Sequence, residues 1–243
     1  MGLVGRGRPQ LHSQEAILDA ARDLVLDGGA RAATVNAIAQ ASGAPKGSIY
    51  HRFASLNDLL AAMWIRAVRR SQNEFIAALA EADAISAAIG AGLSICEFAQ
   101  RHPADARLLA SLRRADLIQS VTTPRLRREL AELNQPLQQT LIELARRLFG
   151  GATPDELERT VFAVVDLPLG ATRRHLIAGT PLPHATRDQL AAAIRAALLQ
   201  GRPTTPTNQA GRPKPDPLRP PGLRAPPIRR DETVGTPRAA QQH

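Results

Sequence analysis

The 243-residue sequence has few of the residues that build β-sheets, disulfides or membrane spans. Phe, Trp and Tyr make up 3% of the chain, and Cys96 is its one cysteine. Scarce aromatic residues and scattered β-branched residues leave little material for strands. A single cysteine excludes an internal disulfide, which is typical of a reducing cytoplasm. No run approaches the roughly 18 consecutive apolar residues of a transmembrane helix. The sequence therefore predicts an all-α, cytoplasmic protein without a membrane segment.

Motifs of common enzyme classes are also missing. The sequence has no Gly-x-Gly-x-x-Gly, no Walker-type loop and no His-Glu-x-x-His. His102, His175 and His184 have no metal-ligand spacing, so we expect them at the surface or at helix ends. Cys96 lies in an apolar stretch, which favours a buried, unreactive thiol over a nucleophile or a redox sensor. We therefore expect no enzyme activity, no cofactor and no bound metal.

Lysine is nearly absent, and positive charge is unevenly distributed. The net charge is +9, with two lysines against 29 arginines. Residues 1–64 hold six basic and five acidic residues, residues 65–200 hold 17 and 14, and residues 201–243 hold eight and three. The basic excess thus lies mainly near the C-terminus. Net charge alone is a weak argument for nucleic-acid binding, and a DNA-binding function has to rest on a motif.

The two ends of the chain differ in composition from its middle. Residues 201–243 hold ten of the 19 prolines and almost no apolar periodicity. Such a segment buries too little surface to offset the entropy of ordering it. We predict a disordered Pro/Arg-rich tail over 201–243. A flexible basic arm is expected over residues 1–12, which lack the apolar core of a signal peptide.

Apolar residues recur at helical spacing from residue 13 to residue 199. Ser13, Thr34 and Ser55 are expected N-caps, and capping boxes are expected at Thr153 and Thr186. Pro168 should kink the helix that contains it. The expected helices cover residues 13–27, 34–41, 46–53, 55–79, 84–101, 103–117, 123–148, 154–178 and 186–199.

The second and third of these helices flank a tight turn, Ser-Gly-Ala-Pro at residues 42–45. Gly43 permits the sharp turn, and we expect Ile49 and Phe53 to point back into a small core. Two short helices joined in this way form a helix-turn-helix. Its second helix enters the major groove of DNA with its N-terminal end first.

The residues of that second helix suit contact with a duplex. Lys46 lies at its entrance, where a flexible point charge reaches a phosphate or a guanine edge. Gly47 lets the backbone approach closely, and Ser48 has a short hydroxyl. Tyr50 and His51 can hydrogen-bond phosphate oxygens. Together these residues favour a recognition helix.

The stretch TVNAIAQASGAPKGSIYHRFASLNDLLAAMW, residues 34–64, resembles the N-terminal domain of the TetR/AcrR family of transcriptional regulators. The matching features are a Thr-capped helix with Ile-Ala, then Ala-x-Gly, Lys-Gly-Ser-Ile-Tyr, a terminal Phe and Ser-x-x-x-Leu. The resemblance covers about residues 11–65 and implies a helix-turn-helix domain over 13–60. The DNA contacts that it implies are Thr34, Asn36, Lys46, Gly47, Ser48, Tyr50 and His51.

The resemblance also implies partners. A homodimer would bind a palindromic double-stranded DNA operator, and a larger helical domain over 61–200 would bind a small-molecule effector and dimerise. That second likeness is architectural. The expected dimer face comprises Leu157, Val161, Val164, Val165, Leu190, Ile194, Ala197 and Leu198. The alternative is that these residues face only the chain's own core. The effector pocket would be lined by Phe75, Phe98 and Leu112, with Arg113 or Asp116 supplying polarity.

Two positions depart from the family pattern. Leu56 stands where members usually have a Lys or Arg that binds phosphate, and Val35 stands where a Thr is sometimes used. Each missing phosphate contact would lower the salt dependence of binding by about one counterion. Arg6 and Arg8 resemble a minor-groove arm, but an unstructured terminus with accidental arginines is the favoured interpretation. A helical scaffold that has lost DNA binding, with Leu56 as its best support, stays open as an alternative.

Overall fold

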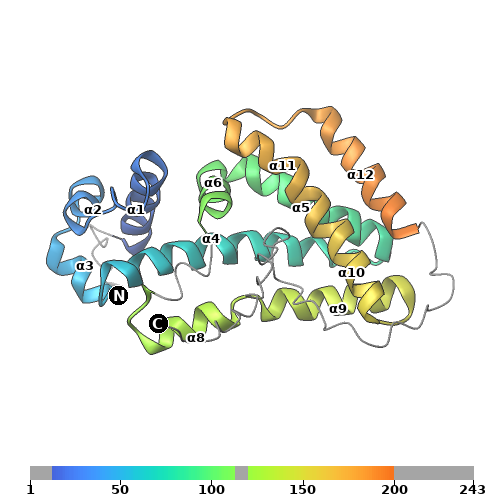
Figure 1. Ribbon diagram of the computed structural model, residues 1–243, viewed down its shortest axis with the longest axis horizontal. Coiled ribbons are helices and arrows are strands. Elements are labelled where there is room, and N and C mark those ends of the chain that lie inside the picture. The colour runs from blue at the N-terminus through green and yellow to red at the C-terminus, as the bar shows by residue number, and fades with distance from the viewer. Residues whose placement is uncertain (1–12, 113–119, 200–243) are drawn as a thin grey trace, which may run out of the picture. The chain divides into compact units, whose positions relative to one another are not determined.

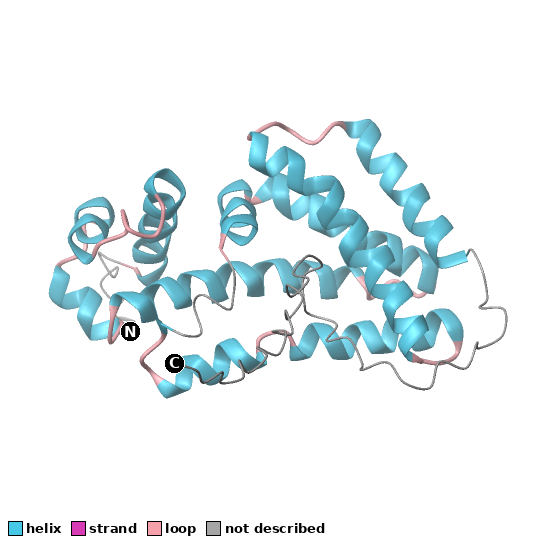
Figure 2. Cartoon of the chain, viewed as in Figure 1, coloured by secondary structure: helices cyan, strands magenta, loops and turns pink. Residues whose placement is uncertain are grey.

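The computed structural model describes residues 13–112 and 120–199, and in these ranges every regular element is a helix (Figure 2). The all-α fold class is therefore confirmed, whereas the expected arm over 1–12 and tail over 201–243 lie outside the described residues. The helices are α1 (Gln14–Gly28), α2 (Val35–Ser42), α3 (Lys46–Arg52), α4 (Leu56–Ala78), α5 (Ala84–Arg101), α6 (Pro103–Ser111), α8 (Pro124–Glu132), α9 (Gln135–Phe149), α10 (Pro154–Val161), the π-helical segment η1 (Phe162–Asp166), α11 (Leu167–Ala178) and α12 (His184–Leu199).

The predicted N-caps of the first, second and fourth helices are confirmed. The side-chain oxygens of Ser13, Thr34 and Ser55 each accept a backbone N–H three residues later, at 3.1 or 3.2 Å. Each bond satisfies one of the N–H groups that a helix start leaves without a partner. Local sequence chemistry therefore sets the starts of α1, α2 and α4.

The helix predicted over 123–148 is wrong, because two helices occupy that span. Leu133 and Asn134 separate α8 from α9, and Pro136 lies in the first turn of α9. In a continuous helix, Pro136 would have no N–H to donate to the carbonyl of Glu132, and its ring would clash with that carbonyl. Proline is tolerated in a first turn, so the chain restarts there. The helix predicted over 103–117 also ends early, at Ser111.

The helix predicted over 154–178 is not one regular α-helix, because a π-helical segment lies just before Pro168, where the sequence predicts a kink. In η1 the N–H of Leu167 donates to the carbonyl of Phe162, five residues back. Pro168 has no N–H to donate, so the wider turn lies directly before it. The capping box at Thr153 is confirmed. The box at Thr186 is wrong, because α12 begins at His184 and places Thr186 inside its first turn.

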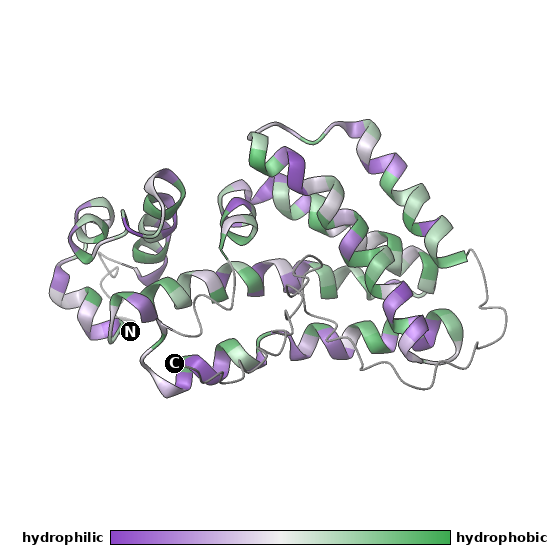
Figure 3. Cartoon of the chain, in the orientation of Figure 1, coloured by the Kyte–Doolittle hydropathy of each residue, from purple (hydrophilic) through white to green (hydrophobic). Residues whose placement is uncertain are grey.

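Helix α4 belongs to two hydrophobic cores and crosses the expected boundary at residues 60 and 61 (Figure 1). Its first part packs with α1–α3, and its last part packs with α5, α9 and α12. The largest fully buried side chains of the N-terminal core are Ile17, Leu18, Ile38, Ile49, Leu59, Met63, Leu108, Val121 and Leu130. Polar residues dominate α8, which lies against α4 (Figure 3). Helix α4 is thus the structural link between the two cores.

Candidate nucleic-acid interface

The turn between α2 and α3 is held by local hydrogen bonds. Gly43 ends α2 with φ 69°, a left-handed conformation that favours glycine. The hydroxyl of Ser42 donates to the carbonyl of Ile38 and accepts the N–H of Ala44. Buried Ala44 anchors the turn, and the carbonyl of Pro45 accepts the N–H of Ser48 at 2.9 Å. These contacts fix the direction in which α3 leaves α2.

One side of α3 faces the N-terminal core. Ile49 is 1% exposed, and Phe53 directly after the helix is also buried, as the sequence predicts. Both pack in the same core as Ile38 of α2. Because residues four apart share a helix face, this burial turns the remaining side chains of α3 outward.

The outward side carries most of the predicted contact residues. Lys46, Gly47, Tyr50 and His51 of α3 are exposed, and Tyr50 keeps 58% of its surface in solvent. Thr34 and Asn36 at the start of α2 are exposed as well. An exposed tyrosine beside a lysine is unusual in a chain with one tyrosine and two lysines. Six of the seven predicted residues are therefore accessible to a partner.

The seventh residue, Ser48, is half-buried and already engaged. The Nη1 atom of Arg52 donates to its hydroxyl and, at 3.2 Å, to its backbone carbonyl. Arg52 was not among the predicted contacts, although its spacing of four residues from Ser48 would have indicated the pair. Gln40 was missed too; it is exposed one helical turn after Asn36. Arg52 and Gln40 extend the polar surface of α2 and α3.

Gly47 has no packing reason to be glycine. A Cβ atom built on it would meet nothing within 4 Å, and its backbone is not in the left-handed region. Glycine inside a helix is less favourable than alanine by roughly 0.5–1 kcal/mol. The missing side chain leaves room for something outside the chain to approach the backbone.

The first residues of α4 contact other parts of the chain, and Leu56 stands where a phosphate-binding Lys or Arg is expected. Leu56 is half-buried and packs against the N-terminal core. Two residues on, buried Asp58 accepts hydrogen bonds from the backbone N–H and the hydroxyl of both Thr122 and Thr123. Burial raises the pKa of Asp58, but these hydrogen bonds outweigh it and hold the pKa below its ordinary value. This segment ties α4 to the segment before α8.

Residues 17–63 match the family described as bacterial regulatory proteins, tetR family. These residues are therefore similar to the tetR family over the N-terminal part of the chain. The match contains all of α2 and α3 and all seven predicted contact residues. The resemblance read from the sequence is therefore confirmed.

Solved structures of TetR-family regulators share the fold of the chain. PfmR from Thermus thermophilus is 20% identical, with 77% of this chain and 99% of that chain covered and a TM-score of 0.57. FadR from Bacillus halodurans is 17% identical, over 78% and 100% of the two chains, with a TM-score of 0.58. SCO4454 from Streptomyces coelicolor is 18% identical, over 82% and 96%, with a TM-score of 0.58. No curated protein sequence matches the chain. These likenesses show a TetR-like fold.

The expected effector pocket of this TetR-like chain is not assembled as predicted. Phe75 is buried in the C-terminal core and Phe98 is also buried, whereas half-buried Leu112 packs against the N-terminal core. Arg113 and Asp116 lie outside the described residues. A cavity of about 380 Å³ instead opens between α5, α6 and α11. It is lined by Ala99, Gln100, Pro103, Arg107, Thr172, His175, Leu176, Gly179, Thr180, Pro181 and Leu182.

Half of the predicted dimer face lies inside the chain's own core. Val164, Leu190, Ile194 and Leu198 are buried, and the other four candidates are half-buried. A Cβ atom on Gly92 of α5 would lie 2.5 Å from Cδ1 of Ile194, so α12 approaches α5 closely through that residue. The four buried side chains therefore pack inside the chain. The sequence pattern alone does not separate such a face from a dimer face.

The described residues also bear on the expectations for Cys96, metal binding and membrane spans. Cys96 is buried with its Sγ 3.3 Å from Oγ1 of Thr172, and burial raises the pKa of the thiol. In the ranges 13–112 and 120–199, no group of His, Cys, Asp and Glu has the arrangement of a metal site. None of the helices in those ranges is long and apolar enough to cross a membrane.

Proposed function

We propose that the chain is a cytoplasmic, ligand-responsive repressor that binds a palindromic operator as a homodimer and is released by a small-molecule effector. The observation that carries this proposal is the two-sided recognition helix α3. Ile49, and Phe53 directly after the helix, are buried in the N-terminal core. Lys46, Tyr50 and His51 are exposed. A helix of a helix-turn-helix needs an outward polar side to reach base edges and phosphates.

Each predicted contact has a distinct role in this proposal. Lys46 supplies a mobile charge at the entrance of α3, and Gly47 lets the duplex approach the backbone. Tyr50 and His51 reach phosphate oxygens. The hydroxyl of Thr34 accepts the N–H of Ala37 at 3.2 Å and keeps its own proton for a phosphate. Asn36 and Ser48 complete the set, with Ser48 held by Arg52.

The outer face of η1, α11 and α12 supports the homodimer. Phe162 is 47% exposed and Leu169 is 50% exposed. A groove of about 480 Å³ runs beside them, lined by η1, α11 and α12. Exposed apolar side chains next to a groove mark a surface for protein association. A second copy would bury them in a four-helix bundle formed by the last two long helices of each subunit.

The apolar cavity between α5, α6 and α11 is our candidate for the effector. A larger cavity of about 600 Å³ is lined by α1, α4 and α8, but its walls hold Arg66, Arg69 and Arg70. The guanidinium groups of these arginines are ion-paired with Glu15, Asp19, Glu129 and Asp105. The smaller cavity combines apolar walls with Gln100, Arg107 and His175, as small-molecule sites do.

Repression then follows from geometry. The two recognition helices of a dimer must be about 34–36 Å apart to enter successive major grooves. An effector that stabilises another spacing weakens operator binding, and by linkage the operator weakens effector binding equally.

Selection of bound fragments from genomic DNA by the purified full chain tests the regulator. We expect recovery of a palindrome that the protein shifts in a competitor-resistant and salt-sensitive way. Absence of any such fragment would support the scaffold alternative, in which the replacement of the phosphate anchor by Leu56 reflects lost DNA binding.

Light scattering after size exclusion tests the dimer. Phe162→Arg should give a monomer and reduce operator affinity about 10²-fold or more, because binding to two linked half-sites is lost. Ile177→Arg is the matched control, since Ile177 is exposed on α11 but lies outside the groove. A dimeric Phe162→Arg variant would place the interface elsewhere.

A further inference from the structure

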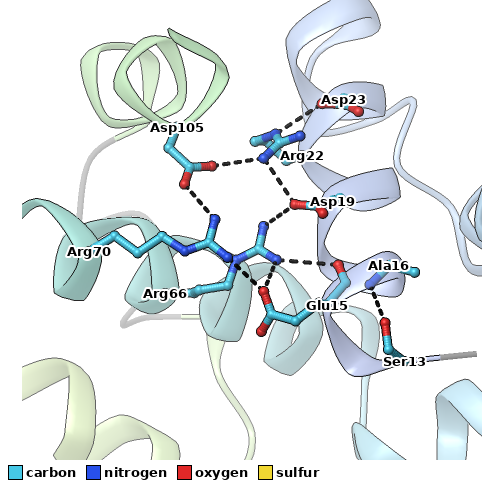
Figure 4. A network of polar contacts seen from close by, with 9 residues as sticks. All are labelled: Ser13, Glu15, Ala16, Asp19, Arg22, Asp23, Arg66, Arg70 and Asp105. Carbon is cyan, nitrogen blue, oxygen red and sulfur yellow. Dashed lines mark hydrogen bonds and ion pairs between the residues drawn. The ribbon is translucent and has the colours of Figure 1, made fainter. Parts of the chain in front are cut away.

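Two groups of arginines lie near the DNA-binding helices, and they differ in how their charge is balanced. In the first group, three arginines of α1 and α4 face four carboxylates at distances of 2.7–3.0 Å (Figure 4). Its members are Arg22, Arg66 and Arg70, with Glu15, Asp19, Asp23 and Asp105. Because the carboxylates outnumber the arginines, this group has no positive charge left for a partner.

The second group lies in the first half of α8. Arg125, Arg127 and Arg128 fall within the first five residues of this helix, and its first turn has no acidic residue. Arg127 has an internal contact, because its Nη2 atom donates to the carbonyl of Val121 at 2.8 Å. Arg125 and Arg128 are exposed, and among the residues that the structure describes neither has an ion-pair partner. Their guanidinium groups are therefore available to an anion.

The positions of Arg125 and Arg128 are unfavourable for the helix that carries them. The start of a helix has a partial positive charge, so a cation in or near the first turn is destabilising. Residues three apart share a helix surface, and two like charges at this spacing repel each other. An anion beside the pair would reverse both effects. Positions that break a local rule without internal compensation are expected at functional sites.

Packing fixes the side of α8 that carries the two arginines. Leu126 packs against the N-terminal core, and Leu130 is fully buried in it. At about 100° per residue, Arg125 and Arg128 point more than about 100° away from the side that these leucines share. Both charges are thus held on the outer surface of α8 in one orientation.

The start of α8 lies beside the start of α4, where the phosphate anchor is missing (Figure 1). Oγ1 of Thr122 lies 3.3 Å from Oγ of Ser55 and donates to Oδ2 of Asp58 at 3.0 Å. Ser55 and Asp58 are on either side of Leu56 in the sequence. The segment that leads into α8 is therefore fixed next to the position at which a Lys or Arg is expected to bind phosphate.

Arg125 also shares a surface with α3 and α1. It lines the cavity of about 600 Å³ together with Arg52, the last residue of α3, and Gln14, the first residue of α1. Arg128 follows after about 4.5 Å of helix rise. Successive charges along one DNA strand are about 3.4 Å apart along the duplex axis. The spacing of the two arginines thus suits neighbouring phosphates of one strand.

We propose that Arg125 and Arg128 bind backbone phosphates of the operator beside the half-site, so that α8 supplies the contact that Leu56 cannot make. Phosphate contacts carry no base information, so these arginines strengthen binding without changing the preferred sequence. Their role rests on the proposed function. It adds to α2 and α3 a DNA contact from a helix about 70 residues further along the chain.

The salt dependence of binding to the palindrome recovered from genomic DNA tests this contact. In the full chain, Arg125→Gln with Arg128→Gln should weaken binding about tenfold and lower the slope of log affinity against log salt by about two per bound subunit. Arg146→Gln with Arg173→Gln is the matched control, because it removes the same charge from exposed residues of α9 and α11. It should leave the slope unchanged. A wild-type slope in the first variant, or an equal loss in the control, would overturn the proposal.

Two further measurements separate phosphate binding from a structural role. Arg125→Lys with Arg128→Lys keeps both charges and should keep the wild-type salt slope. The double Gln variant should melt at or above the wild-type temperature, because it loses a repulsive pair near a helix start. A lower melting temperature of the Gln variant, or a Lys variant as weak as the Gln variant, would overturn the proposal.

The same measurements distinguish this contact from the regulator function as a whole. Wild-type binding by the double Gln variant, with weakened binding by Lys46→Ala, would defeat the α8 contact and leave the proposed function standing. A wild-type chain that shifts no DNA would defeat the proposed function and the α8 contact together.

Discussion

The two sides of the DNA-binding domain use polar side chains in opposite ways. On the outer side, Lys46 and Tyr50 are exposed, and within the described residues neither takes part in an ion pair. On the inner side, Asp58 and Asp105 are buried, and every oxygen of both carboxylates accepts hydrogen bonds. Buried polar groups must be satisfied within the chain, whereas exposed ones are available to a partner. The difference separates residues that hold the domain together from residues that we propose as DNA contacts.

Ile49 and Tyr50 provide the sharpest test, since they are neighbours in α3 and one is buried while the other is exposed. Ile49→Ala should lower the free energy of unfolding by about 2–4 kcal/mol, because it leaves a cavity in the N-terminal core. Tyr50→Ala should change stability by no more than about 0.5 kcal/mol and should weaken operator binding. Urea denaturation and a binding titration measure the two effects. Similar stability losses in both variants would show that Tyr50 also stabilises the fold, so that the outer side would not differ from the inner side in this respect.

The pH dependence of stability tests the role of Asp58 on the inner side of the domain. Its pKa is lower in the folded chain than its ordinary value of 3.8, so its contribution to stability is present above that value. The contribution is lost as the pH falls through the folded pKa. Asp58→Asn should cost about 1–3 kcal/mol at neutral pH and should flatten this acid dependence. Equal acid sensitivity of variant and wild type would assign the effect to other carboxylates.

The salt dependence of operator binding tests the role of Lys46 on the outer side of the domain. Lys46→Ala should weaken operator binding about tenfold and lower the slope of log affinity against log salt by about one. The melting temperature and the oligomeric state should stay unchanged, because Lys46 is exposed. Loss of the dimer together with DNA binding would show that Lys46 has a structural role.

Gly47 gives the smallest expected effect, with opposite signs for folding and binding. Gly47→Ala should stabilise the free chain by about 0.5–1 kcal/mol, because alanine is the better helix former and the added methyl meets no neighbour. Operator binding should fall, because the methyl occupies the space that the duplex needs. Unchanged binding in a stabilised variant would mean that DNA does not approach the backbone here.

The local features of the helix-turn-helix could be predicted from the sequence. Ser13, Thr34 and Ser55 are N-caps as expected, and Gly43 adopts the left-handed conformation of a tight turn. The burial of Ile49 also follows from its spacing along the chain. Each of these features depends on residues within about four positions, a range in which sequence pattern and backbone geometry are directly linked.

The C-terminal helices were predicted less well, because their decisive contacts are not local. Helical spacing marks Ile194 as apolar on one face but does not say whether α5 or a second subunit covers it. The close approach of Ile194 to Gly92 decides in favour of the chain's own core. Pro136 and Pro168 show where a helix must change, yet the results differ: a break before α9 and a π turn before α11.

The sequence by itself determined the fold class, the resemblance of its N-terminal part to the TetR family and the polar face of α3, because caps, turns and helical periodicity act over a few residues. Only the tertiary structure decided which residues pair with the buried carboxylates on the inner side of the DNA-binding domain. Asp58 meets Thr122, 64 residues away, and Asp105 meets Arg22, 83 residues away. No local pattern pairs a carboxylate with such partners; packing of α6 and α8 against the first part of the chain brings them together.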